Sequence, residues 1–246
     1  SYSYAWVQVG LASTLLKQNK IDEATELTSE LLKRDDTRFA TYDLLAEFHI
    51  DNEDYQLGYE IIQEATKLAP SNIERNKKSW KLARLNHDRM GQYLATRNIA
   101  KYAKNSIHDT PDLQLNVIRS GLDLASTLSE IESNKLLINT EKTLARLKQD
   151  FDAATDLVAQ ITIVEVRILH LRKNKKQAEQ VLLSLTRPNA LKNFEDNLDK
   201  VKAFHEVGLW EQSMLLLDQM KENIGHDSFT GKVLAEYLEQ ESKERR

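Results

Sequence analysis

Apolar side chains recur every three to four residues along most of this 246-residue chain, which is the spacing of an amphipathic helix. These periodic segments alternate with short polar turns, and only 3 Pro and 7 Gly interrupt them. The pattern predicts an all-α chain, because a β-rich chain of this length would need many more turn residues. The predicted helices cover residues 4–18, 21–34, 38–51, 55–68, 72–87, 89–105, 111–127, 131–149, 152–173, 177–186, 190–206, 210–223 and 228–243.

The turns of the first three helix pairs recur at a fixed step. The turn segments that begin at Lys17, Asp51 and Leu85 lie 34 residues apart. Small residues keep the same step, as Ala24 and Gly58 show. We expect both small residues at the contact between the two helices of a pair, with no room for bulk. Leucine in place of Ala24 would then overpack that contact.

A helix–turn–helix unit of 34 residues with small residues at its helix contact is the signature of the tetratricopeptide repeat. We therefore expect an all-α right-handed superhelix of about six helix pairs and a C-terminal capping helix. Residues 1–110 would form three regular repeats, and residues 111–246 would continue the same solenoid with degenerate pairs. The helix over 228–243 has one apolar and one polar side, as the capped end of a solenoid requires.

Three short stretches carry a more specific resemblance. Residues 68–75 (LAPSNIER), 82–88 (LARLNHD) and 103–106 (AKNS) resemble the repeat half of bacterial response regulators, in which a receiver domain precedes a tetratricopeptide region. The resemblance implies a cytoplasmic output region in two-component signal transduction, with the phosphoacceptor Asp of the phosphorelay in an upstream receiver domain. Because the sequence opens inside a predicted helix without Met, we expect it to be part of a longer protein.

Composition and the absence of certain motifs disfavour several kinds of chemical site and of partner. The absence of Cys excludes disulfides and thiolate metal sites and is typical of a cytoplasmic protein. The net charge of −4 disfavours nucleic acid as a partner, and no apolar run of about 18 residues predicts a membrane span. No two of the six His have the i, i+4 spacing of a helical zinc site, and no glycine-rich phosphate loop occurs. We expect a non-enzymatic protein without catalytic residues, metal or cofactor.

The resemblance to tetratricopeptide arrays implies a concave groove lined by the first helix of each pair. The implied groove residues are Trp6, Val9, Ser13, Leu16, Asp43, Glu47, Asp51, Lys77, Lys81 and Arg84. The predicted lining changes from apolar to acidic to basic along the groove. The net charge of the chain changes in the same way, from −7 over residues 1–70 to +6 over residues 71–110. This pattern predicts a protein or peptide ligand with an anchor residue on Trp6 and a basic segment that contacts Asp43, Glu47 and Asp51.

Several alternatives remain open. Alternating charge can simply serve solubility and pairing between neighbouring repeats, and Trp6 can be buried against an upstream domain. The chain can be a stand-alone scaffold or an assembly chaperone for a secretion or pilus system. We expect a monomer, although the last helix can also be shared in a dimer.

Single-stranded nucleic acid is the least favoured ligand, and its candidate residues are Arg75, Lys77, Lys78, Lys81, Arg84, Arg89, Arg97, Lys101 and Lys104, with Trp80, Tyr93 and Tyr102.

Overall fold

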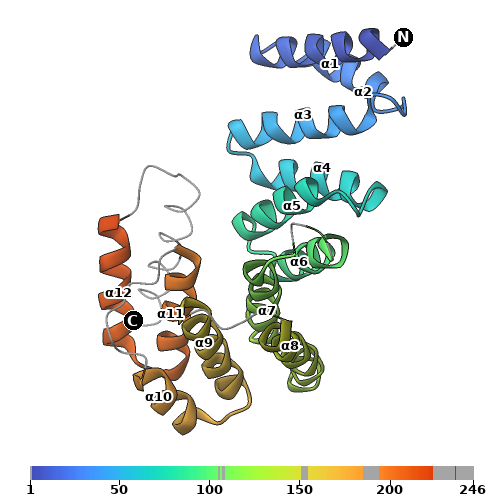
Figure 1. The fold of residues 1–246 in the computed structure, drawn as a ribbon. Helices are drawn as coiled ribbons and strands as arrows, with labels where there is room; N and C mark the ends of the chain where they lie inside the picture. Colours follow the sequence, from blue (N-terminus) through green and yellow to red (C-terminus); the bar gives the residue numbers. More distant parts are fainter. Residues whose placement is uncertain are drawn as a thin grey trace. The chain divides into compact units, whose positions relative to one another are not determined.

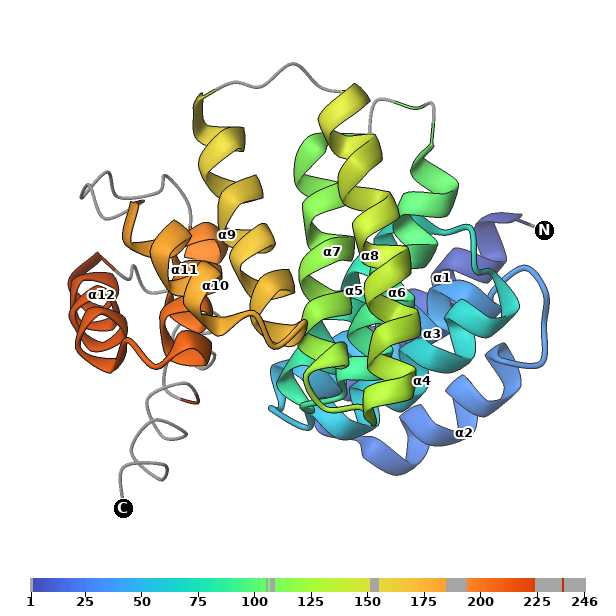
Figure 2. The same ribbon diagram turned by 90° about the horizontal axis from the view of Figure 1, so that it is seen from below.

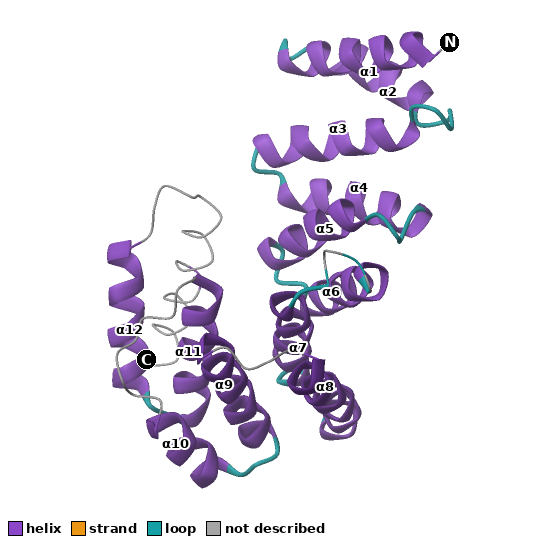
Figure 3. Cartoon of the chain, viewed as in Figure 1, coloured by secondary structure: helices purple, strands orange, loops and turns teal. Residues whose placement is uncertain are grey.

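The computed structural model describes residues 2–104, 109–150, 155–184 and 194–223, together with Ser106 and Glu236. These described residues form helices and short connections, with no strand among them (Figure 3). The prediction of an all-α chain of tetratricopeptide-type helix pairs is therefore confirmed. The predicted capping helix over 228–243 lies outside the described residues.

The chain divides into two compact units, Ser1–Lys104 and Asn105–Arg246. The helices of the first unit follow one another as a stack in Figure 1: α1 (Tyr2–Lys17), α2 (Ile21–Leu31), α3 (Arg38–Asp51), α4 (Tyr55–Leu68), α5 (Ile73–Leu85) and α6 (Arg89–Ala103). The described helices of the second unit are α7 (Pro111–Ala125), α8 (Glu130–Asp150), α9 (Thr155–Leu171), α10 (Lys175–Ser184), α11 (Phe194–Val207) and α12 (Trp210–Asn223). The division falls close to the predicted boundary after residue 110. That the two units form one continuous solenoid stays a prediction.

Five of the helix pairs share the same turn. The first helix ends at a residue with positive φ, and the N–H after it donates to a carbonyl five residues earlier over 2.8–3.0 Å, which is the Schellman motif. The residues with positive φ are Asn19, Glu53, His87, Lys173 and Gly208, with φ between 57° and 86°. The first three are 34 residues apart, as the sequence repeat predicted. The last two extend the motif to α9–α10 and α11–α12.

The residue after each positive φ often starts the next helix as well. Asp54 accepts a hydrogen bond from the N–H of Leu57, and Asp88 accepts one from the N–H of Gly91, so both cap the second helix of their pair. One residue thus ends the first helix with its backbone and begins the second helix with its side chain. This double use keeps the turn short and forces the two helices to run antiparallel in contact.

Apolar clusters then join each pair to the next. Leu15, Leu16 and Ala24 are buried together, and side chains of α3 such as Phe48 pack against them. A second cluster joins α3, α4 and α5 through Ala46, Tyr59, Ile62, Leu82 and Ala83. Each of these clusters spans two pairs, so stability of the unit comes from stacking neighbours.

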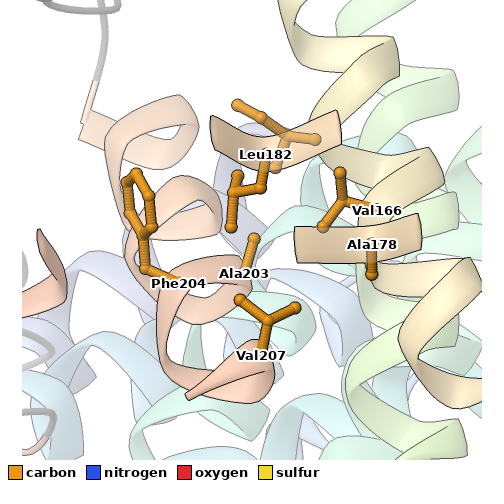
Figure 4. Close-up of a cluster of buried hydrophobic side chains, with 7 residues drawn as sticks. Val166, Ala178, Leu182, Ala203, Phe204 and Val207 are labelled. Carbon is orange, nitrogen blue, oxygen red and sulfur yellow. The ribbon is translucent and has the colours of Figure 1, made fainter. Parts of the chain in front are cut away.

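The second unit has the same construction. α7 and α8 lie side by side (Figure 2). A cluster of α9, α10 and α11 buries Val166, Ala178, Leu182 and Phe204 with their neighbours (Figure 4). A further cluster, which includes Leu198 and Leu217, joins α11 to α12. The turn between α7 and α8 is the exception, since its described residues hold no positive φ.

Two glycines differ in the space around them. At Gly58 an added Cβ would lie 3.5 Å from the carbonyl oxygen of Ala46, which is an ordinary contact, so this position has room for a methyl group. At Gly91 an added Cβ would lie 1.9 Å from the Tyr59 hydroxyl. That hydroxyl donates to Asp88 over 2.8 Å, and burial, followed by this bond, raises the pKa of Tyr59. A bond between α4 and the cap of α6 therefore occupies the space that Gly91 leaves open.

We expect Gly91→Ala to lower the free energy of unfolding by about 1–3 kcal/mol, because the methyl group displaces the Tyr59–Asp88 bond. Gly58→Ala is the matched control, and we expect it to be neutral or to stabilise by up to about 1 kcal/mol through helix propensity. Urea denaturation of both variants measures the difference. Equal stability of the two variants would contradict the packing described around Gly91.

Candidate functional site

The candidate site is the surface formed by the first helices of the first three pairs, α1, α3 and α5, which we call the first-helix face. On α1, Trp6 is 65% exposed, while Val9 and Ser13 are half-buried. Leu16 is only 6% exposed and belongs to the core cluster around Ala24. Three of the four α1 residues predicted for the groove are therefore accessible to a ligand. The fourth, Leu16, is a core residue.

The predicted acidic stretch on α3 is largely paired with the next repeat. The guanidinium of Arg75 donates to both carboxylate oxygens of Asp43, over 3.0 and 2.7 Å, and also lies 4.6 Å above the ring of Phe39. Lys78 forms an ion pair with Glu47. Asp51 is exposed at the end of α3. Two of the three carboxylates expected to bind a basic ligand segment thus already hold cations of α5.

The predicted basic stretch on α5 is engaged in a similar way. Lys77 pairs with Glu74 over 2.7 Å, and the guanidinium of Arg84 lies 5.4 Å from the centre of the Trp80 ring. Lys81 is exposed. Pairing between neighbouring repeats, which the sequence left open as an alternative, is therefore what Arg75 and Lys78 do.

The aromatic residues considered for nucleic-acid stacking also contact cations of their own chain. Arg97 lies over Tyr93 at 5.5 Å, and Lys101 lies over Tyr102 at 4.9 Å. Trp80 contacts Arg84 as described above. A base that stacks on these rings would have to displace the cations, and this favours a structural role for the contacts.

A buried charge network in the second unit was not predicted. Arg167 of α9 has only 1% of its side chain exposed. It donates to Asp123 of α7 over 2.8 Å, to Asp199 of α11 over 2.7 Å, and to both carboxylate oxygens of Glu206 of α11. A single guanidinium thus joins the first helices of three successive pairs.

Further polar groups complete this network. Arg119 of α7 donates to Asp196 over 2.6 Å and to Asp199 over 3.2 Å. Lys202 donates to Asp123 over 2.5 Å, and the amide of Gln160 donates to Asp196. Asp196 and Asp199 are only 2–3% exposed. The network therefore combines three cations with four carboxylates in a region that is mostly closed to water.

The network favours the charged forms of Asp123 and Arg167. Burial alone would oppose ionisation of Asp123, but the charges of Lys202 and Arg167 outweigh it and hold the pKa of Asp123 well below its usual range. Burial also opposes the charge of Arg167, yet Glu206, Asp123 and Asp199 raise the pKa of Arg167 well above its usual value. Each charged group of the network has a partner of opposite charge inside the unit, so this arrangement positions helices.

One signal in the sequence could have found the network. Arg167 interrupts the apolar run Ile161–Leu171, where an arginine is rarely buried unless it is paired. The carboxylates that pair with it lie 32 to 44 residues away along the chain. Periodicity alone does not relate such distant positions, so only the packing of α7, α9 and α11 identifies the partners.

The described residues contain no cluster of three His, Asp or Glu side chains arranged to hold a metal ion. Among the described helices, none is both long and apolar enough to cross a bilayer. One buried ring nitrogen, Nδ1 of His170, lacks a hydrogen-bond partner.

Comparisons with known proteins give distant structural matches. No known family profile and no curated protein matches the sequence. Among solved structures, the tetratricopeptide domain of P58(IPK) shares 11% identity over 99% of this chain and 67% of that chain, with a TM-score of 0.38. A structure of Naa15/Naa10 bound to HypK-THB shares 12% identity over 96% of this chain and 39% of that chain, with a TM-score of 0.31. The fold assignment therefore rests on the helix pairs of this chain.

We expect Arg167→Ala to lower the free energy of unfolding by about 3–5 kcal/mol, because it leaves buried carboxylates without their cation. Arg172→Ala is the matched control. Arg172 also binds a carboxylate, that of Glu141, but its side chain is 34% exposed. We expect this control to cost about 0.2–1 kcal/mol. Chemical denaturation distinguishes the two, and a small effect at Arg167 would mean that the network contributes little.

Stability should also depend on pH through Asp123. Its pKa is lower in the folded than in the unfolded chain, so the stabilisation is present above the unfolded value of about 4 and is lost as the pH falls below that value toward the folded one. Asp123→Asn should be less stable at pH 7, and its stability should fall less steeply on acidification. Urea denaturation between pH 7 and pH 3 measures both slopes. Parallel slopes would show that Asp123 does not carry this dependence.

Proposed function

We propose that the chain is a protein-interaction module whose first unit binds a protein or peptide ligand along the first-helix face. The observation that carries the proposal is the 65% exposure of Trp6 beside half-buried Val9 and Ser13. A large exposed indole next to smaller accessible side chains is the composition of an interface anchor. The buried charge network, by contrast, is satisfied within the chain and offers no partner group.

The ligand chemistry that we propose follows from how the charges are paired. α5 contributes five cations and one carboxylate, and two of those cations neutralise Asp43 and Glu47. A basic ligand segment would have to displace Arg75 and Lys78 to reach the α3 carboxylates. The five cations of α5 exceed Glu74, Asp43 and Glu47 by two charges, so a ligand with an apolar residue for Trp6 and acidic residues toward α5 fits the face better.

At a finer level, we propose the output region of a two-component response regulator. The support is the resemblance of residues 68–75, 82–88 and 103–106 to the repeat half of such proteins. Sequencing the gene upstream of the codon for Ser1 tests it. A receiver domain there would support the role, whereas a signal peptide would contradict it and favour a scaffold or assembly chaperone of a secretion or pilus system.

We expect Trp6→Ala to weaken binding of peptides selected on the purified chain by about tenfold or more, because the anchor contributes about 2 kcal/mol or more. Peptide display followed by fluorescence anisotropy measures this. Tyr4→Ala is the matched control, since it removes a ring that is 63% exposed from a different side of α1. Equal losses in both variants, or no selected peptides at all, would contradict the proposed site.

A further inference from the structure

The outer side of α8 carries a line of exposed side chains with heptad spacing. Ile131 and Ile138 lie seven residues apart and are 71% and 46% exposed. Lys135 and Lys142 each follow an isoleucine by four residues and are exposed as well. Steps of four and three residues are those between the d and a positions of a coiled coil, here with Ile at d and Lys at a. We call these four residues the α8 seam.

The seam is distinct from the packing face of α8. The buried residues of the helix, Leu136, Leu137, Thr140, Leu144 and Leu147, lie on its opposite side, and α8 pairs with α7. α8 therefore contributes to the core of its unit with one face and presents a second apolar line to the surface. Two large aliphatic side chains aligned in this way, rather than scattered singly, mark an interaction surface.

The charges around the seam are arranged asymmetrically. Within the described part of the chain, neither Lys135 nor Lys142 forms an ion pair. The nearby glutamates are engaged elsewhere, Glu130 with Lys173 over 2.7 Å and Glu141 with Arg172 over 3.0 Å. The cations of the seam thus lack compensation, while Glu130 and Glu141 beside them have it. An acidic partner would supply the missing charge.

We propose that the α8 seam docks a helix of another protein that carries apolar side chains at d and acidic side chains at a. Such a helix would cover the two isoleucines and pair its carboxylates with Lys135 and Lys142. A second copy in the parallel register would instead place each lysine opposite itself, which like charges disfavour. The seam is independent of the first-helix face, because α8 belongs to the other unit.

Two other classes of partner fit the seam less well. α8 contains no aromatic residue, so it offers no stacking platform for single-stranded nucleic acid. The helix lacks the Trp or Phe typical of interfacial helices, which disfavours a membrane surface. A narrow line of alternating isoleucine and lysine matches a single helix best.

A charge-swap experiment on the full chain tests the proposal. The probes are two 21-residue helical peptides, one with Leu at d and Glu at a, the other with Lys in place of Glu. We expect the Glu peptide to bind about tenfold or more tightly than the Lys peptide. Lys135→Glu with Lys142→Glu should reverse this preference, and Ile138→Ser should weaken binding of the Glu peptide. Isothermal titration calorimetry measures each affinity, and circular dichroism confirms that the variants fold.

Matched controls lie on α6. Arg97→Glu with Lys104→Glu makes the same charge change at the same seven-residue spacing, and Leu94→Ser replaces a leucine that is 48% exposed. Both should leave binding of the Glu peptide unchanged. The proposal is overturned by equal binding of the two peptides, by no binding, or by equal losses in the α6 variants. Tighter binding of a dT oligonucleotide or of phosphatidylserine vesicles, or self-association that Ile138→Ser abolishes, would also overturn it.

Discussion

The turn that closes the first helix of a pair is the constraint on which the other features depend. A residue in the left-handed region lets the N–H of the next residue return to the carbonyl five residues before it, and that next residue can also cap the following helix, as Asp54 and Asp88 do. Because the turn is short, the two helices must pack against each other along their length. Ala24 and Gly58 lie at positions where that close packing requires small side chains.

Charge serves a different purpose in each unit. In the first unit, Arg75 and Lys78 bind carboxylates of the preceding pair that remain 33% and 51% exposed. In the second unit, Arg167 and Arg119 bind carboxylates that are nearly inaccessible to water. Burial makes such pairs costly to break and sensitive to geometry, so they determine how α7, α9 and α11 align.

The burial of the charges in the second unit limits where a partner can bind. The charged side chains of the network on α7, α9 and α11 already bind one another. The accessible apolar side chains lie elsewhere, with Trp6 on α1 and with Ile131 and Ile138 on α8. The two proposed binding surfaces therefore use residues that contribute little to the cores, and each can change its ligand without loss of the fold.

The sequence by itself determined the helices and their pairing. Helix ranges such as 38–51 and 55–68 agree with α3 and α4, because apolar periodicity is a local property of the chain. The turns were recognised by their 34-residue step rather than by their chemistry, since Glu53 is not among the residues that are enriched at positive φ. Only the tertiary structure decided that Leu16 lies in the core, that Asp43 pairs with Arg75, and that Arg167 has partners on two other helices. The ion pairs depend on contacts between residues 32 to 44 positions apart, and the burial of Leu16 depends on which side of its helix meets a neighbour. The pattern of apolar and polar residues along the chain contains neither kind of information.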